Sequence, residues 1–111
     1  MLFRSQQSVA TGLKIHFSEL DIAVNPKNQA EFVYDETAKK AQIAKFNLLF
    51  KTYQQIPSSQ QYGITFWNVG DQDTWLRGYF KRPKEYPLLF DENYQRKGAY
   101  DELLKAIKHV N

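Results

Sequence analysis

Two short apolar runs with strand character alternate along the chain with two stretches of helical periodicity. The first run covers residues 13–22, is opened by a Thr-Gly turn signal and is closed by Asn25 and Pro26. The second run covers residues 62–69 and is rich in β-branched and aromatic side chains. Both runs are short and apolar, which predicts two buried strands.

Helical spacing marks the segment between these strands and the segment after them. Asp35 and Thr37 are candidate N-caps for a helix over about 38–55. A second helix is predicted over about 99–109, and residues 2–10 are interpreted as the tail of a helix that ends at Gly12. The apolar side chains that define the two main helical faces are Ile43, Phe46, Phe50 and Tyr53 in the first, and Tyr100, Leu103, Leu104 and Ile107 in the second.

The order strand, helix, strand, helix predicts an α/β fold in which the two strands lie parallel. The chain has 111 residues, which allows one small domain over 1–111. Two helices cannot cover both faces of a sheet whose strands are buried on both sides. One sheet face and both strand edges are therefore expected to be open, as in a piece of a larger fold.

Two carboxylates interrupt the apolar pattern at the end of the first strand. Strict alternation puts Glu19 and Asp21 on the face of Ile15 and Phe17, and the opposite face then holds His16, Ser18, Leu20 and Ile22. A carboxylate near a packed interior is costly unless it is paired or used, and α/β enzymes build their sites at the carboxyl ends of parallel strands. A strand that simply emerges into solvent remains an alternative reading.

Two tryptophans follow the second strand. Trp67 and Trp75 flank Asp71 near the end of that strand, and flat aromatic faces stack on sugar rings. The alternative is structural, with Trp67 in the core and Trp75 anchoring the long loop over 70–97.

Composition narrows the possible chemistry further. The chain lacks cysteine, which excludes a disulfide framework, a thiolate metal site and a Cys nucleophile, and two histidines are too few for a zinc site without carboxylates. The net charge of +3 is spread along the sequence, so it does not demand nucleic acid or an anionic membrane. No stretch has transmembrane length and no signal peptide is recognised, so the compartment is left open.

Three motifs together resemble glycoside hydrolase family 10, the retaining endo-1,4-β-xylanases. They are SELD at 18–21, FWNVGDQDTW at 66–75 and PLLFDENYQ at 87–95. The resemblance covers about 11–107 and implies the last quarter of a TIM (β/α)8 barrel, from the seventh strand to the eighth helix. Residues 1–10 would end the sixth helix, and about six strands would be missing.

The resemblance implies a role for each candidate site residue. Glu19 falls on the catalytic nucleophile, and Asp21 on the aspartate that orients a histidine of the missing sixth strand. The acid/base glutamate belongs to the missing fourth strand. Trp67 and Trp75 fall on tryptophans that line the sugar site, whereas His16 is interpreted as a structural residue packed toward the outer helices. Neither a metal nor a cofactor is implied.

The chain departs from the family pattern at three positions. Asn68 stands where glycine is usual, Gly70 where a small hydroxyl residue or alanine is common, and Gly98 where proline is frequent. Basic residues in the same long loop favour a solvated loop over a polyanion site; they are Arg77, Lys81, Arg82 and Lys84.

From the resemblance, we expect this chain to be part of a xylan-hydrolysing enzyme. The chain alone is expected to be inactive, because the acid/base glutamate is absent. The expected partners are xylan or xylo-oligosaccharides, together with the missing N-terminal part of the barrel or further copies of the chain in a homo-oligomer. Neither nucleic acid nor a membrane is expected, and the parent enzyme is expected to be secreted or periplasmic. A non-catalytic carbohydrate-binding or structural module is the competing function.

Overall fold

The computed structural model describes residues 7–109 and contains both predicted strands and both main helices. They are β1 (Ile15–Leu20), α2 (Glu36–Gln54), β2 (Gln61–Phe66) and α4 (Gly98–His109). Three short turns join them: η1 (Ser58–Gln60), η2 (Asp71–Asp73) and α3 (Trp75–Gly78). Part of the helix predicted over 2–10 lies outside the described residues; within them, residues 7–9 are helical and Gly12 has a φ of 74°.

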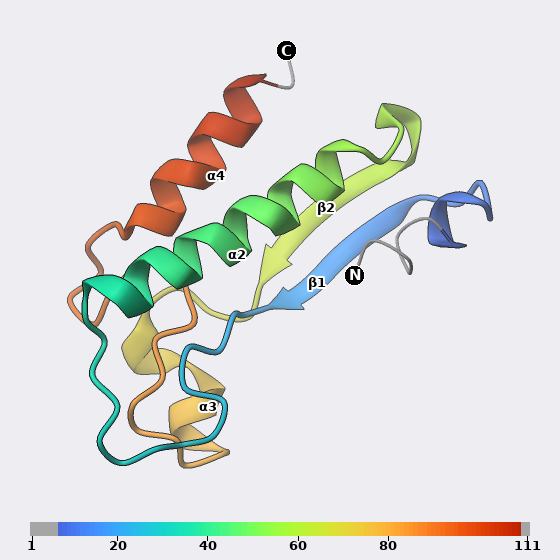
Figure 1. The fold of residues 1–111 in the computed structure, drawn as a ribbon. Helices are drawn as coiled ribbons and strands as arrows, with labels where there is room; N and C mark the ends of the chain where they lie inside the picture. The colour runs from blue at the N-terminus through green and yellow to red at the C-terminus, as the bar shows by residue number, and fades with distance from the viewer. Residues whose placement is uncertain (1–6, 110–111) are drawn as a thin grey trace.

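The strands β1 and β2 pair in parallel, and α2 connects them (Figure 1). The helix α2 lies along one face of this two-stranded sheet, and α4 packs against α2. The long loops and α3 gather at the carboxyl ends of both strands. The fold is therefore a (βα)2 unit, as the order of elements predicts.

The core lies between the sheet, α2 and α4. Asp35 starts α2, because its side chain accepts a hydrogen bond from the backbone N–H of Ala38 at 2.9 Å. Phe46, on the buried side of α2, is fully inaccessible to solvent. The buried cluster consists of Phe46, Leu49, Phe50, Leu89 and Ala99, and strand side chains including Phe17, Leu20, Ile64 and Phe66 pack against it.

A bulge in β1 breaks the strict alternation that the sequence suggests. Phe17 pairs with Ile64 and Leu20 pairs with Phe66, so two residues of β1 stand opposite one residue of β2. Glu19, inside the bulge, has a φ of 54°. Phe17 and Leu20 consequently both face the core, and the predicted grouping of Phe17 with Glu19 on one face is wrong.

The second face of the sheet is open in the part of the chain that the structure describes. The side chains exposed on the strands there include His16, Ser18, Tyr62 and Thr65. His16 bonds through Nε2 to the hydroxyl of Thr65 at 2.8 Å, and its ring lies 5.0 Å from that of Tyr62. The expectation that His16 packs toward the helices is thus wrong. The bulge separates Phe17 from the face of Glu19, so Phe17 lies on the helix side, where its ring contacts Tyr53 of α2. The neighbouring His16 therefore lies on the open side.

Over residues 7–109, none of the helices combines the length and the apolar character needed to cross a membrane.

Candidate functional site

The ends of β1 and β2 bring three of the four predicted site residues into direct contact. The backbone N–H of Trp67 donates to the carbonyl of Leu20 at 3.1 Å, so the strands are still joined where the site begins. The indole N–H of Trp75 donates to Oδ2 of Asp21 at 2.8 Å. The rings of Trp67 and Trp75 meet edge to face with their centroids 6.2 Å apart. An acid from one strand end and two aromatic rings from the other therefore share one surface.

Glu19 lies two residues before Asp21, with an exposed side chain. Because the neighbouring Leu20 packs on the core, Glu19 belongs to the open side of the sheet. Its φ of 54° is in the left-handed region, where a residue other than glycine costs of order 1–3 kcal/mol. Strain of this kind clusters at functional sites, which favours a role for Glu19 that glycine cannot fill.

Glu19→Gly is expected to raise the free energy of unfolding by about 1 kcal/mol. Glycine removes the strain of a left-handed backbone, and this gain exceeds the extra conformational entropy that glycine loses on folding. Glu19→Gln keeps the strained backbone and serves as the control. Denaturant unfolding of both variants at one fixed protein concentration makes the comparison. Equal midpoints for the two variants would show that the bulge is not strained.

The loop over 70–97 is held by a buried ion pair. Asp71 and Lys97 approach to 2.9 Å, with side chains 0% and 7% exposed. Asp71 also accepts the backbone N–H of Leu88 at 2.8 Å, and Lys97 donates to the carbonyl of Tyr86 at 2.8 Å. Burial raises the pKa of the Asp71 carboxyl and lowers the pKa of the Lys97 ammonium, and each partner's charge opposes the other's shift. The pair fixes the start and end of the loop that carries Trp75.

A second buried carboxylate joins the two loops at the strand ends. Glu85 is fully buried and accepts the backbone N–H groups of Val24 at 2.7 Å and of Asn25 at 3.1 Å. It therefore connects the segment after Asp21 to the loop of Trp75. Sequence reasoning missed Glu85 and Lys97, because their partners lie far away along the chain and neither residue sits in a recognisable local pattern.

Asp71→Ala is expected to lower the free energy of unfolding by about 3–5 kcal/mol, since it leaves the Lys97 ammonium buried without a counter-charge. Asp71→Leu combined with Lys97→Met removes both charges and is expected to cost much less. Denaturant titration followed by tryptophan fluorescence compares the variants with the unaltered chain. A loss no larger for Asp71→Ala than for the double variant would contradict the structural role of this pair.

The basic residues of the loop have different environments. The Arg77 guanidinium lies 4.7 Å from the ring centre of Tyr86, pairs with Glu92 at 3.2 Å and leaves 17% of its side chain exposed. Lys84 donates to the carbonyl of Ala30. The prediction of a simply solvated loop is therefore wrong for Arg77 and Lys84, whereas the Lys81 side chain is exposed.

Two departures from the family pattern have a local structural account. Asn68 has a φ of 105°, a conformation that glycine adopts without strain, and its side chain donates to the carbonyl of Asp73 at 2.9 Å. At Gly98 an added Cβ would lie 2.5 Å from Cδ1 of Ile43, so the side chain of Ile43 occupies the space that a larger residue needs.

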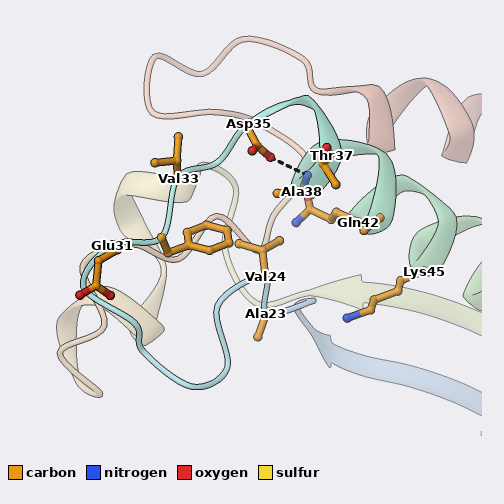
Figure 2. A pocket seen from close by; sticks show the side chains of 11 residues that line it. Ala23, Val24, Glu31, Val33, Asp35, Thr37, Ala38, Gln42 and Lys45 are labelled. Atoms are coloured by element: carbon orange, nitrogen blue, oxygen red, sulfur yellow. Dashed lines mark hydrogen bonds between the residues drawn. The ribbon is translucent and has the colours of Figure 1, made fainter.

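A separate groove lies between the 23–35 loop and the first turns of α2 (Figure 2). Its volume is about 560 Å³. Asp35 in its wall is already hydrogen-bonded to Ala38 as the helix cap, and Glu31 lies earlier on the same 23–35 loop. None of the four predicted site residues lines this groove, which is distinct from the surface at the strand ends. Over residues 7–109, no three His, Cys, Asp or Glu side chains form a group that could hold a metal ion.

Known xylanases resemble this chain over most of its length. Residues 4–106 match the family described as Glycosyl hydrolase family 10. Endo-1,4-beta-xylanase B of Butyrivibrio fibrisolvens is 36% identical over 101 residues, which are 87% of this chain and 14% of that enzyme.

Solved structures agree with this match. Native xylanase 10C of Cellvibrio japonicus superposes with a TM-score of 0.84 at 31% identity, covering 99% of this chain and 25% of that one. A mutant of the same xylanase in complex with xylopentaose gives a TM-score of 0.82 at 31% identity, over 99% of this chain and 24% of that one. The chain thus spans a quarter or less of the length of these three relatives, and its (βα)2 unit corresponds to the last quarter of a TIM barrel. By sequence and by fold, the chain belongs to glycosyl hydrolase family 10.

Proposed function

We propose that this chain supplies the nucleophile and one wall of the sugar site to a retaining endo-1,4-β-xylanase. The observation that carries the proposal is the meeting of Asp21 with Trp75, and of Trp75 with Trp67, with the strained Glu19 two residues before Asp21 on the same strand end. A carboxylate next to exposed aromatic faces suits a reaction at a sugar ring.

The proposed reaction is a double displacement. The Glu19 carboxylate attacks the anomeric carbon while a protonated carboxyl group gives its proton to the leaving oxygen, which breaks the glycosidic bond. Water then attacks the covalent glycosyl–enzyme, with the second carboxyl group now acting as base. The two carboxyl groups of such an enzyme stand about 5–5.5 Å apart. The second group is assigned to the part of the barrel that lies outside this chain.

Asp21 and the tryptophans are proposed to position the sugar. The carboxylate of Asp21 holds the indole of Trp75 through the 2.8 Å hydrogen bond, which fixes the direction of that ring. Trp67 is 44% exposed and Trp75 is 39% exposed, so both rings retain surface for a sugar. Asp21 therefore serves the site through Trp75, in addition to the histidine contact implied by the family resemblance.

Co-expression of this chain with the N-terminal portion of a family 10 barrel tests the proposal. Restored hydrolysis of xylan that is lost again in the Glu19→Gln variant supports it. Restored hydrolysis that is unchanged in this variant would contradict the assignment of the nucleophile.

A non-catalytic sugar-binding module is the second candidate, favoured by the exposure of Trp67 and Trp75. Binding of xylan by the chain, combined with failure of every barrel portion to restore hydrolysis, would favour this function over the first.

The isolated chain is expected to self-associate. Tyr62 and Trp67 are 67% and 44% exposed, and in the described residues β1 and β2 pair only with each other. Exposed apolar surface favours association by about 25 cal/mol per Å², and open strand edges offer unpaired backbone groups. Light scattering coupled to size exclusion at micromolar concentration measures the mass. A compact 13.1 kDa monomer with cooperative unfolding would contradict the expectation.

A further inference from the structure

The aromatic surface at the strand ends continues beyond the two tryptophans. The ring of Phe80 lies 4.9 Å from that of Trp75, and the ring of Tyr79 lies 5.1 Å from that of Phe80. Both contacts are edge to face, at 71° and 89°. Phe80 is 45% exposed and Tyr79 is 78% exposed. Four rings therefore form one series from Trp67 to Tyr79, and each ring leaves surface accessible to solvent.

The backbone fixes the outer two rings relative to Trp75. The carbonyl of Trp75 accepts the N–H groups of both Tyr79, at 2.8 Å, and Phe80, at 3.1 Å. Leu76 anchors this turn in the core with 7% exposure, and its carbonyl accepts the N–H of Arg82 at 2.8 Å. The backbone that carries the outer rings is thus ordered before any ligand binds, which lowers the entropic cost of binding.

One cation borders the outer rings, and a second follows Phe80 directly in the sequence. The Arg82 guanidinium lies 5.7 Å from the ring centre of Phe80. Lys81 has a φ of 55°, a strained conformation for lysine. Within residues 7–109, neither side chain forms an ion pair or a hydrogen bond with another side chain, and the segment 74–84 contains no Asp or Glu. This end of the aromatic series therefore carries two cationic side chains that form no ion pair among the described residues.

We propose that Tyr79, Phe80, Lys81 and Arg82 form a further subsite for xylose units that carry a uronic acid. The inference rests on the proposed function, since it extends the Trp67–Trp75 surface along the same polysaccharide. Tyr79 and Phe80 offer apolar surface to a sugar ring, and Lys81 and Arg82 pair with the carboxylate of the side group. The subsite distinguishes acidic from neutral xylan, which the two tryptophans alone do not.

Affinity electrophoresis of the full chain in native gels tests this subsite. One gel contains glucuronoxylan, and a matched gel contains the same polysaccharide after reduction of its carboxyl groups. Tighter binding of the acidic form by about fivefold at low salt is expected from two exposed ion pairs. Lys81→Gln combined with Arg82→Gln should remove that preference and leave binding of the reduced form unchanged, whereas Tyr79→Ala should weaken both.

Lys40→Gln combined with Lys45→Gln is the control, because it removes the same charge from exposed positions on α2. A preference that survives the Lys81 and Arg82 changes, or that falls equally in the control, would show general charge attraction and overturn the inference. If the chain bound both polysaccharides equally, and Trp67→Ala weakened that binding, the uronic acid subsite would be overturned. The proposed function would stay intact.

Discussion

In the reassembled barrel, Glu19→Gln lowers the rate of xylan hydrolysis by about 10⁴-fold or more, the scale seen when a covalent nucleophile is removed. Glutamine keeps the size of the side chain and the bulged backbone, but its neutral amide cannot form the glycosyl–enzyme bond. Initial rates on xylan, measured with the same N-terminal portion for each variant, give the comparison.

Asp21→Asn provides the matched control two residues away. Asparagine retains an oxygen that accepts the Trp75 indole N–H, so the sugar wall is preserved and only the charge is lost. The loss of activity is therefore expected to be much smaller than that of Glu19→Gln. Unchanged hydrolysis in the Glu19 variant would show that another group is the nucleophile.

The isolated chain is expected to hydrolyse xylan at no measurable rate. A glycosidic alkoxide is a poor leaving group unless it is protonated, and general acid assistance contributes about 10²–10⁴-fold. In the proposed function the chain provides only one side of the sugar site, so the isolated chain would lack part of the binding energy that positions the substrate.

An aryl xylobioside separates the two causes of inactivity, because its leaving group needs little protonation. Slow turnover of the aryl substrate without turnover of xylan would assign the loss mainly to the missing acid. Turnover of xylan by the purified chain at rates normal for the family would contradict the proposed division of the site.

Much of the fold could be predicted because its signals are local. The spacing of Phe46, Phe50 and Tyr53 indicates the buried side of α2, and Asp35 marks its start. The β-branched and aromatic run at 62–69 indicates β2, which the structure places at Gln61–Phe66. The bulge at Glu19 was not predictable, because one extra residue reverses the faces of a strand without a compositional mark. The faces assigned to His16 and Phe17 were wrong for that reason.

The candidate site could be predicted only in part. The family motifs indicate Glu19, Asp21, Trp67 and Trp75. The hydrogen bond between Asp21 and Trp75, however, joins residues 54 positions apart. The pairing of Asp71 with Lys97 likewise depends on how a long loop folds back on itself. Such contacts depend on tertiary packing. Neither the spacing of apolar residues nor the composition of the chain predicts them.

Covalent trapping of the reassembled enzyme tests the central claim most directly. A 2-deoxy-2-fluoro xylobioside with an activated leaving group slows the second displacement, so that the glycosyl–enzyme accumulates and its site is found by mass spectrometry of peptides. The proposed function predicts one sugar on the peptide that contains Glu19, and none in the Glu19→Gln variant. A label on any other residue, in an enzyme that hydrolyses xylan, would contradict it.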